Sequence, residues 1–173
     1  YDVQQYILKE IDRKGCMMEA LPICGVNENS ADPHYCPDAK ESKQVKKGDF
    51  ILIDLWCKRK APRSVYADIT RVAVAGKPTD RHMEIFHIVS KAQKAGTELV
   101  RQRVTSREPV KGCEVDDACR AVIEQAGYGK YFTHRTGHNI HEEDHGPGPN
   151  IDGFETLGGV FALRGGGHRV ERH

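Results

Sequence analysis

An aspartate stands inside the most apolar stretch of the sequence, and this position strongly limits how the chain can fold. Asp54 lies in the middle of FILIDLW (residues 50–56), whose length and β-branched content predict a buried strand. An unpaired carboxylate would lose its water there with nothing to replace it. Asp68 has a comparable place in VYADITRVAV (residues 65–74), and a strand hairpin would bring the two carboxylates together. Two converging acids need a shared positive charge.

Two kinds of cation could supply that charge. One is a pair of divalent metal ions roughly 3.5–4 Å apart, which carboxylates can bridge and which activate a water between them. The other is a nearby arginine, for which Arg59, Arg63 and Arg71 are the candidates. For either acid alone we favour the arginine, whereas the two acids together favour the metal pair.

A cluster of histidines adds nitrogen ligands to this interpretation. In HRTGHNIHEEDHGPGPN (residues 134–150) four histidines fall within twelve positions, and imidazole is the commonest nitrogen ligand of transition metals. His138 follows a glycine at the end of a predicted strand, and His145 precedes a Gly-Pro turn. One of these two can bind metal while the other contacts substrate. For His134 and His141 an exposed or hydrogen-bonded ring is the better interpretation.

The order of the remaining elements predicts an α+β domain. Apolar residues at helical spacing indicate an amphipathic helix that ends at Gly15, and a Pro-, Gly- and Asn-rich loop containing His34 follows. Two long helices come after the strand pair, and two further strands come after the helices. We therefore expect helices on one face of a curved, largely antiparallel sheet. The expected ranges are loop 21–47, helices 79–104 and 114–126, and strands 131–140 and 159–164.

Composition narrows the classes of protein that remain. The length of 173 residues favours a single domain. Twenty-six basic residues nearly balance 25 acidic ones, without a basic stripe, so we expect no nucleic-acid partner. No apolar stretch approaches the ~20 residues that span a bilayer, and the N-terminus is amphipathic rather than a signal peptide, so we expect a soluble cytoplasmic protein. The six cysteines are scattered without a CxxC pair, which predicts free thiols.

These segments together resemble the pita-bread metallopeptidases, a family that includes methionine aminopeptidases, Xaa-Pro aminopeptidases, prolidases and creatinase. The resemblance spans nearly the whole chain, residues 1–173. Its most specific pieces are NSADPHY, ILIDLW followed by YADITR, and HRTGHNI followed by HG, with Glu155-Thr156 also fitting. The sequences of these segments are most similar to those of the Xaa-Pro peptidase branch.

The resemblance implies a fold, a cofactor and roles for five residues. Asp54, Asp68 and His138 would bind two divalent metal ions, for which Mn, Co, Zn or Fe are all suitable. His34 would bind substrate or assist proton transfer, and His145 would contact the substrate or the tetrahedral intermediate. The implied fold is the pita-bread fold, with helices on the outer face of the sheet. The implied reaction is removal of N-terminal residues from short peptides, and the resemblance leaves open whether the protein is a homodimer.

Several positions depart from the family pattern. The hairpin link KRKAPRS (residues 58–64) carries a small insertion, and His141 stands where a glycine is common. Arg164 occupies the place of a glutamate that normally binds metal and serves as general base, which should weaken metal binding. Glu171 resembles the last, bridging glutamate. The helix that usually precedes the chain and part of the C-terminal strands are missing, so we expect an incomplete or altered member.

Three further interpretations compete with the metallopeptidase. The first is a non-catalytic protein of the same fold that binds a peptide or partner without turnover, for which Arg164 is the argument. The second is a creatinase-like hydrolase that acts on a small non-peptide substrate, since fold alone does not decide function. The third is a soluble α+β domain without a site, which must treat two strand acids and two well-placed histidines as accidents.

Overall fold

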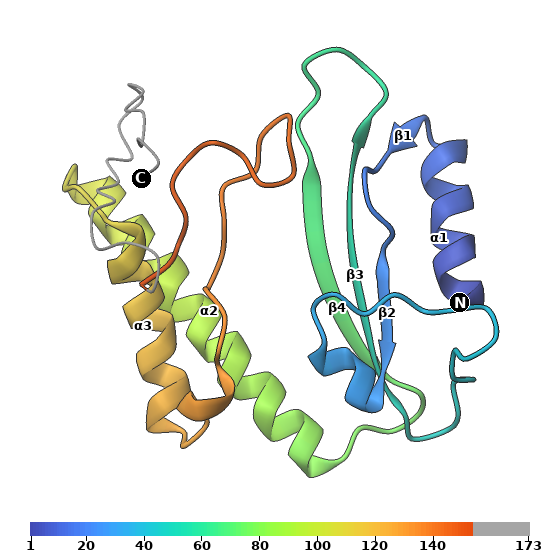
Figure 1. Cartoon of the computed structure of the whole chain (residues 1–173). Coiled ribbons are helices and arrows are strands. Elements are labelled where there is room, and N and C mark those ends of the chain that lie inside the picture. Colours follow the sequence, from blue (N-terminus) through green and yellow to red (C-terminus); the bar gives the residue numbers. More distant parts are fainter. Residues whose placement is uncertain (154–173) are drawn as a thin grey trace. The chain divides into compact units, whose positions relative to one another are not determined.

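The computed structural model describes residues 1–153, and its contacts divide the chain into two compact units (Figure 1). Unit 1 consists of residues 1–79 together with 140–144. Unit 2 consists of residues 80–139 and the chain from His145 onward. The expectation of a single domain stays a prediction.

Unit 1 begins with the amphipathic helix that the sequence predicts. Helix α1 spans Asp2–Arg13, and Gly15 follows it with a φ of 68°, a left-handed conformation that suits glycine at a helix end. The buried stripe differs in phase from the apolar spacing, because Gln4 is 1% exposed while Tyr6 is 65% exposed. The Gln4 amide donates to the carbonyl of Pro22 at 2.9 Å, so its burial leaves the amide satisfied and docks α1 on the following loop.

Strand β3 (Phe50–Arg59) is the common member of every pairing in the antiparallel sheet of unit 1. It pairs with β4 (Ala67–Val74) as the predicted hairpin, with β2 (Ile23–Val26) and with the two-residue β1 (Cys16–Met17). Strand β2 was not predicted, because its four residues lie in a stretch rich in loop formers. The short 3-10 helix η1 (Asn27–Ala31) follows it directly.

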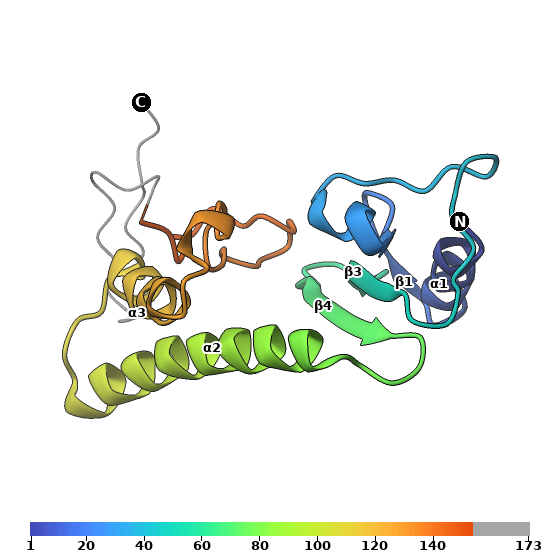
Figure 2. The ribbon, with the colours of Figure 1, turned by 90° about the horizontal axis from the view of Figure 1, so that it is seen from below.

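Unit 2 is built on two helices that pack side by side (Figure 2). Helix α2 spans Asp80–Ser106 and helix α3 spans Gly112–Gln125, which confirms both predicted helices to within two residues at each end. Gly127 follows α3 with a φ of 83°, as the predicted stop requires. The 3-10 helix η2 (Gly129–Tyr131) comes next.

Gly96 lets α2 and α3 approach closely. A side-chain carbon at this position would lie 2.5 Å from Cys119 Sγ and 3.2 Å from Val115 Cγ1, which is closer than packed atoms allow. We expect Gly96→Val to lower the free energy of unfolding by about 1–3 kcal/mol, because the added methyl groups overpack a contact in which Cys119 is 3% exposed. Urea unfolding measures this. The control is Thr97→Val on the exposed side of the same helix, and equal stability of the two variants would refute the close contact.

The chain after η2 does not form the strand predicted over residues 131–140. Only a single antiparallel bridge joins Gly137 to Ile151, and the rest of the segment is irregular. Several backbone groups of the segment instead form hydrogen bonds with the side chains of Asp116 and Arg120 in α3. The strand predicted over residues 159–164 lies outside the described residues.

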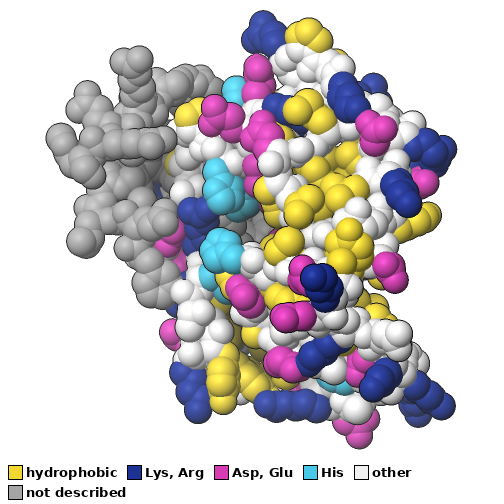
Figure 3. All heavy atoms as spheres, turned by 45° about the vertical axis from the view of Figure 1, so that its right-hand side comes forward, with side chains coloured by type: hydrophobic (Ala, Val, Ile, Leu, Met, Phe, Trp, Pro, Cys, Tyr) yellow, Lys and Arg dark blue, Asp and Glu magenta, His cyan; other side chains and the backbone are white. Residues whose placement is uncertain are grey.

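Three general expectations concern the chain as a whole. Over residues 1–153, no helix is both long and apolar enough to cross a bilayer. All six cysteines are free thiols, as predicted. Lysine and arginine side chains are interspersed with aspartates and glutamates on the face that Figure 3 shows.

Candidate metal and substrate site

The pairing of β3 with β4 places the two candidate aspartates on one face of the sheet. Asp54 lies opposite Thr70, and Trp56 lies opposite Asp68. Because side chains alternate between faces along a strand, these four residues share a face, with the aspartates in diagonal positions. Diagonal neighbours lie about 7–8 Å apart, so two carboxylates there can converge on ions between them. The register therefore makes Asp54 and Asp68 diagonal neighbours on one face of the sheet in unit 1.

The environment of the two aspartates differs from the expected buried strand. Asp54 and Asp68 are both half-buried, and every residue from 50 to 58 in β3 is of intermediate exposure. The expectation of two buried acids is therefore wrong for the described structure. Asp54 is instead held by a short hydrogen bond, which the Thr70 hydroxyl donates to its Oδ1 at 2.6 Å. This bond fixes the orientation of the Asp54 carboxylate toward the shared face.

The same register argues against an arginine as the partner of Asp54. Arg71 lies opposite Ile53, so it projects from the other face of the sheet, and Arg59 is also on that face by alternation along β3. Arg63 belongs to the hairpin link, where its Nε lies 3.9 Å from Glu142 Oε1. Neither Arg59 nor Arg71 therefore shares the face of Asp54.

His138 and His145 come together in unit 2. Their ring centroids are 4.4 Å apart, with an interplanar angle of 66°. Nδ1 of His138 lies 3.1 Å from the backbone carbonyl of Asn139, and the Gly146 amide donates to the same carbonyl at 3.0 Å. With Nδ1 as the donor to this carbonyl, Nε2 carries the lone pair of the neutral ring. The two histidines are thus brought together as a pair.

A buried carboxylate in α3 fixes the chain that leads to His138. Asp116 is 0% exposed, and its Oδ1 accepts hydrogen bonds from the Thr136 amide at 2.9 Å and the Thr136 hydroxyl at 2.6 Å. Arg120 Nε donates to Asp116 Oδ2 at 3.1 Å, and its guanidinium also donates to the carbonyls of Phe132 and His134. These contacts hold residues 132–136 to the helix. Sequence reasoning missed them, although an Asp and an Arg four residues apart beside a helix's apolar stripe are a signal for such a pair.

His134 and His141 are both exposed. Nδ1 of His134 lies 2.8 Å from the carbonyl of Arg135, and the ring of His141 is exposed. His141 instead contributes its backbone carbonyl, which accepts from the Tyr66 amide at 2.9 Å. Lys58 Nζ likewise donates to the carbonyl of Glu142 at 2.5 Å. Residues 140–144 are therefore anchored to the β3–β4 hairpin within unit 1.

Tyr66, which provides one of these anchors, is itself buried at 4% exposure. The ammonium of Lys58 lies 4.8 Å from the centroid of its ring, a cation–π contact. Burial raises the pKa of the Tyr66 phenol, and the nearby carboxylate of Glu19 raises it further. Sequence reasoning did not select Lys58 or Tyr66, because neither residue type in a hairpin link is a signal of tertiary contact.

His34 lies in the exposed loop that follows η1. Its amide donates to Asp32 Oδ1 at 2.9 Å, which shapes the chain as a tight turn. The loop starts where η1 folds back on β2, and Gly25 permits this because a Cβ there would lie 2.8 Å from the carbonyl oxygen of Asn29. The structure therefore places His34 at an accessible turn of unit 1.

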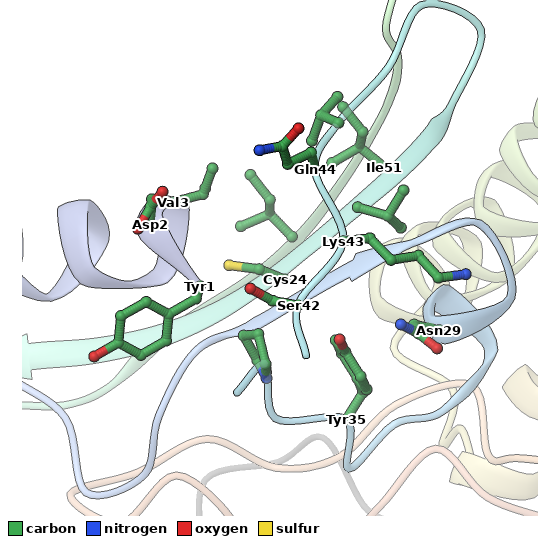
Figure 4. Close-up of a pocket in the computed structure, with 14 residues that line it drawn as sticks. Tyr1, Asp2, Val3, Cys24, Asn29, Tyr35, Ser42, Lys43, Gln44 and Ile51 are labelled. Carbon is green, nitrogen blue, oxygen red and sulfur yellow. The ribbon is translucent and has the colours of Figure 1, made fainter. Parts of the chain in front are cut away.

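A cavity of about 240 Å³ lies in unit 1, and it is separate from the aspartate pair (Figure 4). Ile51 and Ile53 line it, and these residues alternate with Asp54 along β3, so the cavity is on the opposite face of the sheet. Cys24 of β2 and Tyr35 of the following loop complete much of the wall. The aspartate pair thus faces away from this cavity.

Comparison with known proteins fits this geometry. Residues 1–166 match the sequence profile of Metallopeptidase family M24. The chain belongs to metallopeptidase family M24. The Xaa-Pro dipeptidase of Pyrococcus horikoshii is 35% identical over 153 residues, which are 82% of this chain and 40% of that protein. This M24 chain therefore spans about two fifths of the length of such relatives.

Solved structures of M24 relatives have the same fold. The dipeptidase PepE from Mycobacterium ulcerans matches with a TM-score of 0.77 and 29% identity, covering 93% of this chain and 39% of that one. The prolidase from Pyrococcus furiosus matches with a TM-score of 0.73 and 26% identity, covering 94% of this chain and 44% of that one. The expected α+β, pita-bread class is thereby confirmed.

The donor atoms of this M24 chain fit divalent metal ions in type. Asp54 and Asp68 offer carboxylate oxygens on one face of unit 1, and within unit 2 His138 offers an imidazole nitrogen. Each of these donor types suits ions such as Mn, Co, Zn or Fe. Over residues 1–153, no three acidic, histidine or cysteine side chains are grouped closely enough to hold an ion by themselves. Glu171, the fourth predicted ligand, and Arg164 lie outside the described residues.

The Thr70 hydrogen bond allows a test of the aspartate site that leaves the carboxylate in place. We expect Thr70→Val to weaken Mn²⁺ binding by about 10–100-fold, because loss of an outer partner lets the Asp54 carboxylate rotate. Isothermal titration with Mn²⁺ measures the affinity. Thr97→Val in α2 is the matched control, and unchanged affinity in Thr70→Val would show that this hydroxyl does not orient a ligand.

Proposed function

We propose that this chain is part of a metal-dependent peptidase that removes N-terminal residues from short peptides with proline in the second position. The single observation that carries the proposal is the diagonal pair of Asp54 and Asp68 on one face of the hairpin, in a member of family M24. The preference for proline is supported by the Xaa-Pro dipeptidases among its relatives.

The proposed roles follow from the chemistry of each side chain. Asp54 and Asp68 would hold two divalent ions, with His138 as a nitrogen ligand, and Thr70 would keep the Asp54 carboxylate oriented. Such ions lower the pKa of a bound water toward neutrality and polarise the scissile carbonyl. His34 and His145 would donate hydrogen bonds to the developing negative charge, for which their exposed rings are accessible.

The direct test is metal-dependent hydrolysis by this chain. After loading with Mn²⁺ or Co²⁺, we expect release of alanine from Ala-Pro and Ala-Pro-Ala, with much slower release from Ala-Ala, and loss of all cleavage in EDTA. Cleavage of a small non-peptide amide in place of these peptides would favour a creatinase-like hydrolase. Cleavage that persists in EDTA would overturn the metal-dependent proposal.

Arg164 favours a second candidate function, binding of a peptide or partner without turnover. A positive side chain in the sequence position of a glutamate ligand would repel the ions that Asp54 and Asp68 attract. This candidate predicts little metal and no cleavage in the chain as it stands. Elemental analysis after metal loading separates the two candidates, since recovery of metal in Arg164→Glu would indicate a preserved fold whose chemistry has been disabled.

A further inference from the structure

Two of the six free cysteines lie side by side in unit 1. Cys16 of β1 pairs with Arg59 of β3, and Cys57 is two residues before Arg59 on the same strand. Residues two apart on a strand share a face, so the side chains of Cys16 and Cys57 are diagonal neighbours on one face. Burial is the main cause that raises the pKa of the Cys57 thiol, and the neighbouring Cys16 thiol raises it further.

The surroundings leave the two sulfurs accessible to each other and to a reagent. Both cysteines are half-buried rather than enclosed. The residue opposite Cys57 on β4 is Ala67, whose small side chain leaves room beside the thiol. The Cys16 thiol lies 3.8 Å from the carbonyl of Lys14, which is a weak contact. Neither thiol is therefore enclosed by packed side chains as the thiol of a core cysteine is.

The other four cysteines are in different settings. Cys24 lies opposite Ile53, four residues along β3 from Cys57, which is roughly 13 Å at the rise of a strand. Cys119 is 3% exposed against Gly96 in unit 2, which also holds Cys113. Cys36 is exposed in the loop that follows η1. Among the six cysteines, all of which lie within residues 1–153, Cys16 is therefore the one that is a cross-strand neighbour of Cys57.

We propose that Cys16 and Cys57 are a dithiol modification site that a low-molecular-weight disulfide such as oxidised glutathione converts reversibly into a cross-strand disulfide between β1 and β3. The Cys16 thiolate attacks one sulfur of oxidised glutathione, forms a mixed disulfide and releases one glutathione thiolate. The Cys57 thiolate then attacks the Cys16 sulfur, forms the Cys16–Cys57 bond and releases the second glutathione. The two protein thiols are oxidised, and one glutathione disulfide is reduced to two glutathione thiols, which take up the two protons that the protein thiols lose.

The order of these two attacks follows from the setting of the thiols. A thiol with a raised pKa has a smaller thiolate fraction at neutral pH, so Cys57 is suited to the second, intramolecular step, in which proximity compensates for low reactivity. The product would tie the end of α1 and β1 to the strand that carries Asp54. The site is independent of the proposed peptidase activity, because its thiols project from the other face of β3 from the aspartates.

The experiment is peptide mapping of the folded chain after oxidation. The chain is incubated with oxidised glutathione, blocked with N-ethylmaleimide and digested with trypsin and Glu-C, which separate Cys16 in residues 15–19 from Cys57 in residues 48–58. We expect these two peptides to be joined, about 2 Da lighter than their sum, and to separate on reduction. The link should persist in Cys24→Ser, be lost in Cys16→Ser, and give way to scrambled pairs in urea.

A second measurement uses the stability of the oxidised chain. A disulfide that closes the loop from residue 16 to residue 57 should raise the melting temperature by roughly 5–15 °C, and dithiothreitol should reverse the rise. Glutathione adducts on Cys16 or Cys57 without a joined peptide would overturn the proposal. A link from Cys57 to Cys24 instead of Cys16 would overturn it as well.

Discussion

Asp54→Asn is expected to weaken Mn²⁺ binding by more than about 100-fold and to remove metal-dependent peptide cleavage. The substitution keeps the size of the side chain, but it removes the negative charge and one oxygen donor from the face shared with Asp68. Loss of an outer partner of a ligand already costs about 10–100-fold in affinity, so loss of a ligand itself should exceed that range. Isothermal titration with Mn²⁺, together with cleavage of Ala-Pro, measures both effects.

The matched control for this prediction is Asp12→Asn in α1. Asp12 is an exposed aspartate of the same unit, and its ion pair with Lys60 lies at the surface, where such pairs contribute little. We expect the control to bind Mn²⁺ as the unsubstituted chain does. Asp68→Asn should behave like Asp54→Asn, and the double variant should lose little more, because the two carboxylates act as one site. Equal Mn²⁺ affinity in Asp54→Asn and Asp12→Asn would remove the basis of the metal proposal.

Asp116→Ala is expected to lower the free energy of unfolding by about 3–5 kcal/mol, because it removes one partner of a buried ion pair. The variant leaves Arg120 beside the gap and deprives the Thr136 amide and hydroxyl of their acceptor. The Gly153 amide also loses a 3.3 Å bond to the same carboxylate. Urea unfolding measures the loss. Asp117→Ala is the control, because Asp117 is the adjacent residue of α3 and is exposed.

The same carboxylate should make stability depend on pH. Burial alone raises the pKa of Asp116, but hydrogen bonds from Thr136 and Arg120 lower it by more, so the folded pKa lies below the ordinary value of 3.8. A group with a lowered folded pKa contributes its full stability above the ordinary value and loses it as pH falls through the folded pKa. Acid titration of unfolding should therefore be steeper in Asp117→Ala than in Asp116→Ala. Identical profiles would show that Asp116 is not the linked group.

The helices and the central hairpin could be predicted because their signals are local. Apolar spacing located α1 and α2, the glycines at 15 and 127 marked the ends of α1 and α3, and the run from Phe50 to Trp56 located β3. The short strand β2 has four residues and no room for a period to show. The segment from Tyr131 to Ile140 has strand-like composition, but side-chain acceptors such as Asp116 take its hydrogen bonds, and composition carries no information about that competition.

The candidate site was predictable where a residue is unusual for its own segment. Asp54 is conspicuous in an apolar strand, and the register confirms that it shares a face with Asp68. Its degree of burial was predicted wrongly, because hydropathy of a strand does not reveal which elements cover it. The anchors at Lys58 and Tyr66 depend on a contact with residues more than 70 positions away, and no pattern in the hairpin link encodes that partner.

Strand β3 separates two sets of residues by parity alone. Even positions place Asp54 and Trp56 on one face of the sheet, whereas odd positions place Ile51, Ile53 and Cys57 on the other. The face on which a β3 side chain lies therefore depends only on whether its position is even or odd. Deletion of one residue between Phe50 and Asp54 would move Asp54 to the face of the cavity, while deletion of two would keep it on its present face. Residues 60–64 lie beyond the last β3–β4 pair, so length changes there leave the alternation along both strands intact.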